Sequence, residues 1–264
     1  MRKLVLLFYF VLIYNGYSQE KKYSITGGFE SNTQWFLNDK KLLNEFYQPV
    51  TQPEKPIRSN NYLFVNFKYK NWMAGIQAEG YKTEYESLKI YNPKYEDINV
   101  ATYFLQYKNE NIDVTGGYFY EQFGSGLLLR SWEDRSLGIN NSLRGGRIIF
   151  KPASFLIIKS LYGQQRTGFN VSKGKIYGAD FEMSLSEVFK KDNFDLSIGA
   201  TYVGRDEKTT ILNPKFNDLT NAYAGRISFS KNSFYLTSEY NYKTEDAVVQ
   251  VKNQIDNNLI KPGS

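Results

Sequence analysis

The chain has 264 residues, with 33 lysines and arginines against 27 aspartates and glutamates, and it contains neither cysteine nor histidine. These missing residue types exclude disulfides, thiolate metal sites and a Ser-His-Asp triad, so we expect no catalytic residues, no metal site and no cofactor. The basic excess is spread out without a basic run, which gives no indication of nucleic-acid binding. Tyrosine and phenylalanine number 22 and 19, far more than a soluble domain usually carries.

The first 18 residues have the organisation of a secretory signal peptide. Arg2 and Lys3 precede an apolar core, Leu4–Tyr14, that is too short to cross a bilayer as a helix. Gly16 and Ser18 supply small residues for cleavage before residue 19. Without Arg2 and Lys3, 31 basic residues remain against 27 acidic ones, a net charge of +4. We therefore expect residues 1–18 to be removed and residues 19–264 to form the mature protein.

From residue 23 onward, apolar and polar residues alternate in segments typical of strands. Eleven strands are predicted, at 23–34, 62–69, 74–81, 101–108, 112–121, 146–151, 155–164, 176–185, 194–203, 222–230 and 234–242. Short turns join most of them at one end. Long loops are predicted at Leu37–Asn60, Lys82–Asn99 and Arg205–Asn221.

The two faces of these strands differ in character. One face carries Tyr, Phe, Leu, Ile, Ala and Gly, as expected for a surface in contact with lipid. The other face carries charges of both signs: Glu30, Lys68, Glu79, Lys108, Asp113, Lys159, Asp180, Glu182, Asp195, Arg226 and Glu239. A lysine or arginine facing lipid costs about 2–4 kcal/mol at the bilayer midplane, so this face is predicted to line a lumen. Such a lumen can hold itself together by ion pairs or conduct ions.

The pattern predicts an all-β fold, an antiparallel transmembrane β-barrel in the outer membrane of a Gram-negative bacterium. A soluble β-sandwich or solenoid also has alternating strands, but strand length, the alternation of short and long connections and the aromatic content favour the barrel. The eleventh strand would run outward, followed by a polar stretch at 243–264. Because bacterial barrels close with an even number of strands, we expect the chain to be the N-terminal portion of a longer barrel.

The segment Phe119–Arg147 interrupts the hairpins, and residues 123–146 are predicted to be an inserted loop that plugs the lumen. Its glycines are candidate hinges: Gly124, Gly126, Gly145 and Gly146. Its charged residues alternate in sign: Arg130, Glu133, Asp134, Arg135, Arg144 and Arg147. They indicate either a constriction that selects solutes or, the reading we favour, a salt-bridged fold pinned to Glu79, Asp113 and Glu121. The two readings are compatible.

The central segment also carries a resemblance. Gly116-Gly117-Tyr118, Glu121-Gln122-Phe123-Gly124-Ser125-Gly126, Arg130, Glu133-Asp134-Arg135 and Leu137-Gly138 resemble an uncharacterised family of Bacteroidota outer-membrane β-barrel proteins. The resemblance implies an outer-membrane location and no established activity, so no catalytic residue is carried over.

The expected function is a passive pore or a surface scaffold, and the chain is not expected to be an enzyme. The expected partners are outer-membrane lipid, with other envelope proteins or surface glycans at the outer loops, and no nucleic acid. Two alternatives stay open: a secreted soluble β-rich binding protein, and an outer-membrane hydrolase, against which the missing histidine argues.

Overall fold

The computed structural model describes residues 23–43, 46–51, 56–82, 98–135, 139–208, 218–249, 255–260 and 262–263. The predicted signal peptide lies outside these residues, as do 83–97 and 209–217 of the two later predicted loops. In the described ranges, no helix combines the length and the apolar character needed to cross a membrane.

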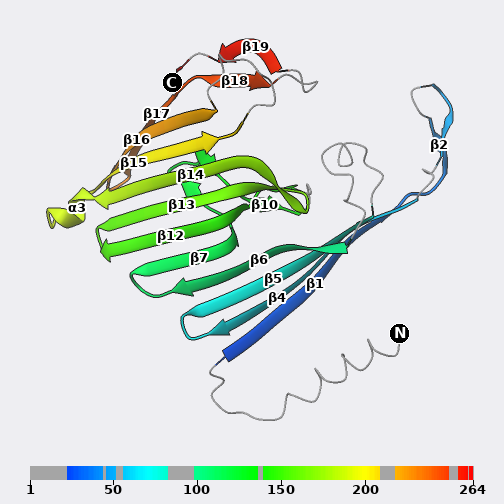
Figure 1. Cartoon of the computed structure of the whole chain (residues 1–264), viewed down its shortest axis with the longest axis horizontal. Helices are drawn as coiled ribbons and strands as arrows, with labels where there is room; N and C mark the ends of the chain where they lie inside the picture. Colours follow the sequence, from blue (N-terminus) through cyan, green and yellow to red (C-terminus); the bar gives the residue numbers. More distant parts are fainter. Residues whose placement is uncertain are drawn as a thin grey trace.

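The structure is all-β and is built on one antiparallel sheet of eleven strands (Figure 1). Across the sheet these are β1 (Tyr23–Trp35), β4 (Ile57–Tyr69), β5 (Trp72–Lys82), β6 (Ile98–Lys108), β7 (Ile112–Phe119), β12 (Leu143–Ala153), β13 (Leu156–Thr167), β14 (Asn170–Ser184), β15 (Asp195–Asp206), β16 (Leu219–Lys231) and β17 (Phe234–Lys243). The eleven predicted strands are thereby confirmed. The sheet is curved and open: β1 and β17 are its edges, and in the described part of the chain they do not pair with each other.

The region predicted as one long loop at Leu37–Asn60 is partly strand. β2 (Asp39–Leu43) pairs with β3 (Pro49–Val50), and this hairpin projects well beyond the end of the sheet (Figure 1). β4 already begins at Ile57. The prolines were a misleading signal because Pro49 is the first residue of a short edge strand, where a missing N–H removes no central ladder bond.

Two further segments hold more regular structure than predicted. β13 and β14 run on to a turn at Gly168, which has a φ of 62°. The stretch 243–264, for which only a polar character was predicted, contains the hairpin of β18 (Asp246–Val249) and β19 (Ile255–Ile260). β14 and β15 are joined through a single helical turn, α3 (Leu185–Val188).

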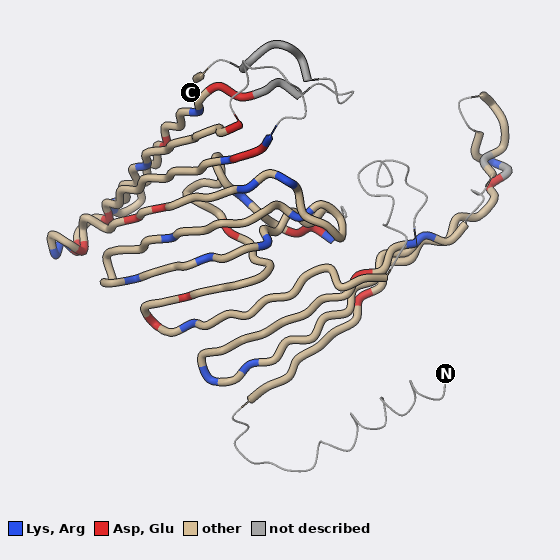
Figure 2. The backbone as a smooth tube through the Cα atoms, in the orientation of Figure 1, with Lys and Arg blue, Asp and Glu red and all other residues tan. Residues whose placement is uncertain are grey.

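The polarity of the sheet follows the predicted alternation and is the reverse of a soluble domain. On one face, here called the outer face, large apolar side chains are exposed: Ile25, Phe29, Leu63, Val65, Ile76, Leu105, Ile148, Ile227, Leu236 and Tyr240. The opposite, inner face holds buried polar side chains: Glu79, Asp113, Thr115, Asp180 and Thr201. Soluble proteins bury their apolar face and expose their charges. Figure 2 shows Lys/Arg and Asp/Glu interspersed along the strands.

Candidate functional site

The excursion between β7 and β12, residues 120–142, is called the insert, and its described residues, 120–135 and 139–142, lie over the inner face. Its described residues form two small hairpins, β8 (Gln122–Phe123) with β9 (Leu129–Arg130) and β10 (Glu133–Asp134) with β11 (Ile139–Asn140). The loop predicted at 123–146 therefore begins and ends earlier, because residues 143–146 belong to the wall strand β12.

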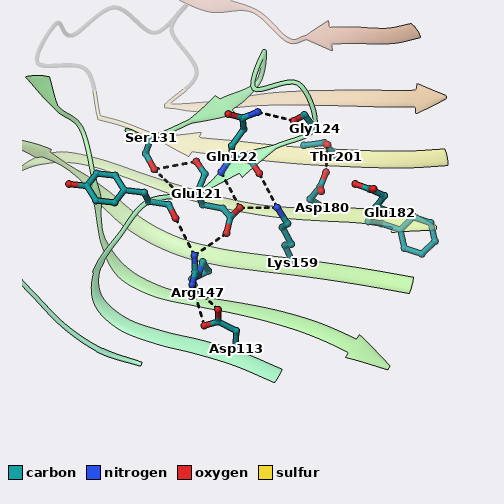
Figure 3. Close-up of polar contacts among 12 residues, drawn as sticks. Asp113, Glu121, Gln122, Gly124, Ser131, Arg147, Lys159, Asp180, Glu182 and Thr201 are labelled. Carbon is teal, nitrogen blue, oxygen red and sulfur yellow. Dashed lines mark hydrogen bonds and ion pairs between the residues drawn. The ribbon is translucent and has the colours of Figure 1, made fainter. Parts of the chain in front are cut away.

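A charged cluster fixes the start of the insert (Figure 3). Glu121 is buried, and it accepts hydrogen bonds from Lys159 Nζ at 2.9 Å and from Arg147 Nη1 at 3.3 Å. The same arginine donates through Nη2 to both carboxylate oxygens of Asp113 at 3.2 Å. Two cations thus face two carboxylates. Buried charges are tolerated when they are paired and hydrogen-bonded in this way.

An apolar anchor lies beside this cluster. Phe123 is 1% exposed, and it packs with Leu129 of the insert and with four side chains of the inner face: Phe119, Leu143, Leu161 and Val203. A Cβ atom on Gly178 of β14 would lie 2.7 Å from Cε2 of the Phe123 ring. Because real Cβ atoms do not approach so closely, the glycine provides the room in which the ring sits.

The insert reaches the strand at one edge of the sheet. Gly124 has a φ of 52°, and a Cβ there would lie 2.6 Å from Nη1 of Arg226. Arg226 donates from this nitrogen to Asp180 Oδ1 at 2.8 Å. The next residue, Ser125, donates its backbone N–H to Glu239 of β17 at 3.2 Å.

The insert also reaches the opposite edge. Arg135 donates to Glu30 of β1 at 2.8 Å and to Gln77 of β5 at 3.1 Å, and its Nε lies 3.5 Å from Glu133. Its guanidinium lies 4.9 Å from the centroid of the Tyr62 ring. Burial opposes the charge, but the hydrogen bond to Glu30 and the attraction of Glu133 outweigh it and raise the pKa of Arg135. One short segment therefore contacts both edge strands.

A second ion pair joins two distant strands of the sheet without involving the insert. Arg166, carried by the extension of β13, donates from Nη1 to Glu79 Oε1 of β5 at 3.0 Å, and Tyr81 donates to the other oxygen at 2.6 Å. Both charged side chains are almost fully buried. The prediction that Glu79 pins the insert was therefore misplaced, because its cationic partner comes from a hairpin of the wall.

The six charged residues of the predicted constriction do not converge on one point. Arg135, Glu133 and Arg147 form ion pairs on the inner face, although Arg147 belongs to β12 rather than to the insert. Arg130 is exposed beside the Trp132 ring. Arg144 is exposed in β12 and alternates with inner-face neighbours, so it lies on the outer face. Asp134 pairs with Ile139 in the β10–β11 hairpin.

The four predicted hinge glycines divide into two kinds. Gly124 and Gly126 have positive φ values of 52° and 91° and shape the turn between β8 and β9. Gly145 and Gly146 lie within β12. At Gly145 a Cβ would lie 2.0 Å from the carbonyl oxygen of Tyr162, which is a close approach of two backbones rather than a hinge.

Sequence reasoning missed several residues that hold the site together: Lys159 as the partner of Glu121, Arg166 as the partner of Glu79, and the Phe123–Gly178 contact. Lys159 was placed on the correct face by alternation alone. Nothing in the sequence distinguished Phe123 from the other phenylalanines, and no local pattern indicated that it packs against Gly178.

A cavity of about 450 Å³ separates the insert from β4–β7. Its wall side is formed by Phe64, Asn66, Gln77, Thr102, Phe104 and Gln106, and Tyr120, Glu133 and Arg135 of the insert lie across from them. The Tyr120 side chain is 39% exposed, but partial desolvation of its hydroxyl and the nearby Glu133 carboxylate raise the pKa of Tyr120. Among the described residues, no cluster of acidic side chains is placed to hold a metal ion.

The chain belongs to a family of unknown function (DUF6029), whose sequence model matches residues 1–264. No curated protein matches the chain. The function is therefore argued from geometry and chemistry.

Proposed function

We propose that the sheet forms part of the wall of an outer-membrane β-barrel. The barrel is a passive passage for solutes, and the insert plugs this passage. The observation that carries the proposal is the inverted polarity of the sheet. Phe29 and Ile25 on the outer face are 69% and 65% exposed, while Glu79 and Asp180 on the inner face are 1% and 3% exposed. Hydrocarbon outside and water inside satisfy both faces at once.

The contacts of the insert support a wall that curls around it. Ser125 binds Glu239 on one edge strand and Arg135 binds Glu30 on the other. A sheet edge left open in lipid would expose unsatisfied backbone N–H and C=O groups. We therefore propose that, in the membrane, the edges β1 and β17 are closed by further strand pairing.

The pairing of the charges favours a held plug over an open constriction. Glu121 and Arg135 of the insert each bind wall residues of opposite charge, and Phe123 adds an apolar contact. An open passage would require these contacts to break. The resting state is therefore the plugged one, and solutes pass when the insert shifts.

The test is to remove the plug without disturbing the wall. Leu143 pairs directly with Phe119, so residues 120–142 can be replaced by an Asn-Gly turn that joins β7 to β12 as a tight hairpin. In planar bilayers, the wild-type protein should show small, rare openings and the replacement variant a large, steady conductance.

Extraction is the control for this experiment. Both proteins should stay in the membrane fraction after a carbonate wash. A variant that inserts and folds but does not conduct would contradict the passage, and recovery of the wild type in the soluble fraction would favour a secreted binding protein.

A second candidate function, a surface scaffold, is favoured by the projecting β2–β3 hairpin. Leu42, Leu43, Phe46 and Tyr47 near its tip are exposed, with Tyr47 83% exposed. A protruding apolar tip is typical of a protein-binding surface. A photo-cross-linker placed at Phe46 in intact cells should capture one specific envelope protein; labelling of lipid alone would reject the scaffold.

A further inference from the structure

We propose that the cavity between the insert and β4–β7 binds a neutral saccharide of one or two sugar rings. This deepens the proposed function by naming the class of solute that the passage admits. Only the transport of that solute rests on the proposed function, because binding requires the cavity alone.

The wall of the cavity carries aromatic rings that lie across glycines. Asn66, Gly75 and Phe104 are cross-strand neighbours in one row of β4, β5 and β6. A Cβ on Gly75 would lie 2.3 Å from Cε1 of the Phe104 ring, and a Cβ on Gly28 would lie 2.6 Å from Cζ of Phe64. The Phe104 ring therefore covers the backbone at Gly75 and borders the cavity, where it is the ring offered for stacking. The Phe64 ring also borders the cavity, but the guanidinium of Arg135 lies 6.0 Å from its centroid. The C–H face of a sugar ring is a suitable partner for such a surface.

The polar groups around these rings are neutral. In the part of the chain that the structure describes, the side chains of Asn66 and Thr102 form no hydrogen bond, and both line the cavity. Gln106 uses its amide nitrogen on Asp113 at 2.8 Å, which leaves its amide oxygen as an acceptor. Amide and hydroxyl groups that donate and accept are what a ligand rich in hydroxyl groups requires.

The charges around the cavity argue against an anionic ligand. Arg135 is paired with Glu30 and Glu133, which gives that group a net charge of −1. Arg147 and Lys159 are balanced by Asp113 and Glu121. Among the described residues that line the cavity, a phosphate or carboxylate would therefore find no uncompensated cation.

The size of the cavity fits this class of ligand. Small-molecule sites measure about 300–1,000 Å³ and combine apolar surface with a few polar groups. At about 450 Å³, this cavity lies at the lower end of that range. It has room for a sugar of one or two rings and not for a long glycan chain.

Titration calorimetry on the full-length protein in detergent tests the proposal, with maltose and cellobiose as neutral probes and glucuronate as the charged one. Phe104→Ala should weaken disaccharide binding at least tenfold. The adjacent Leu105→Ala is the matched control, because Leu105 is 52% exposed on the outer face, and it should change affinity less than twofold. Thr102→Val, which keeps the shape of the side chain, should weaken binding severalfold.

The outcomes separate the two proposals. The saccharide site is overturned if neither disaccharide binds at millimolar concentration, if Phe104→Ala binds as the control does, or if glucuronate binds more tightly. Sugar binding by a protein that does not insert into membranes would keep the site and reject the passage. If the protein conducts ions, binds neither disaccharide, and its conductance is unchanged by maltose and cellobiose, the passage is kept and the saccharide site is rejected.

Discussion

The two halves of the inner face are built differently. Over β7 and β12–β17, the insert is packed through Phe123 and its apolar neighbours and through the cluster around Glu121. Over β1 and β4–β6, the inner face carries aromatic rings and amides around a cavity, and the insert approaches it through Arg135. We call the first part, where the insert packs against the sheet, the filled half, and the second part, which borders the cavity, the open half.

The seam between the halves is short. β6 pairs with β7 only from Phe104↔Gly117 to Lys108↔Asp113, whereas β15 and β16 pair along nearly their whole length. The Glu79–Arg166 pair adds a link across the seam. The packing contacts of the insert are therefore concentrated in the filled half, and the space for the proposed ligand lies in the open half. Movement between them is expected at the seam.

The largest expected effect comes from cutting the buried link between the halves. Arg166→Ala leaves Glu79 buried without its cation, which should lower the free energy of unfolding by about 3–5 kcal/mol. Urea unfolding of the micelle-bound protein, followed by tryptophan fluorescence, measures it. The double variant Glu79→Gln/Arg166→Met leaves no unpaired charge at this link and should regain at least half of the loss. If Arg166→Ala is as stable as the wild type, the Glu79–Arg166 pair does not hold the two halves together.

The next effect concerns the filled half alone. Phe123→Ala removes the apolar anchor of the insert and should cost about 3 kcal/mol. The insert should then become sensitive to protease while the wall stays protected. Leu127→Ala, in the same hairpin loop but 69% exposed, is the control and should change stability by less than about 0.5 kcal/mol. Equal protease sensitivity of the two variants would remove the distinction between the halves.

Local alternation made the wall predictable, and it could not supply the connections across the wall. Period-two patterning placed Asp113 and Lys159 on the inner face because the face of a strand is a local property. The Glu79–Arg166 pair joins residues far apart in sequence, and Arg166 lies beyond a register shift after Gln164. A register shift of one residue moves the following side chains to the other face of the sheet. Alternation counted from the preceding residues therefore does not predict the face on which Arg166 lies.

The boundaries of the insert and the cavity were also beyond the sequence. Glycines mark both turns and close backbone contacts, and only coordinates separate Gly124 in a turn from Gly145 against Tyr162. The cavity depends on Gly75 lying beside Phe104, which requires the register of two strands joined by a long connection. No short-range pattern specifies such a register.

A smaller effect is expected at the contact between the insert and the open half. Arg135→Gln removes the ion pair with Glu30, whose side chain is 42% exposed, so the loss of folding stability should be small. At 0.15 M salt the passage should open severalfold more often in bilayer recordings. The difference should shrink at 1 M salt, where the Debye length falls to about 3 Å. Arg130→Gln, at an exposed arginine of the same insert, should leave the openings unchanged, and identical behaviour of the two variants would contradict a tether at Arg135.

The smallest effect is confined to alkaline pH and tests how the hydroxyl of Tyr120 packs beside Glu133. Tyr120 accepts a hydrogen bond from Asn140 at 2.7 Å, and burial together with Glu133 raises the pKa of its phenol. Free tyrosine ionises near pH 10. The folded insert therefore favours the neutral phenol, and this contribution to stability is complete below about pH 10 and is lost as the pH rises toward the folded pKa. Absorbance at 295 nm should show that Tyr120→Phe removes less than one ordinary tyrosine's signal near pH 10, because the raised pKa keeps more of Tyr120 protonated there. A loss equal to one ordinary tyrosine at that pH would contradict the raised pKa of Tyr120 and the packing of its hydroxyl beside Glu133.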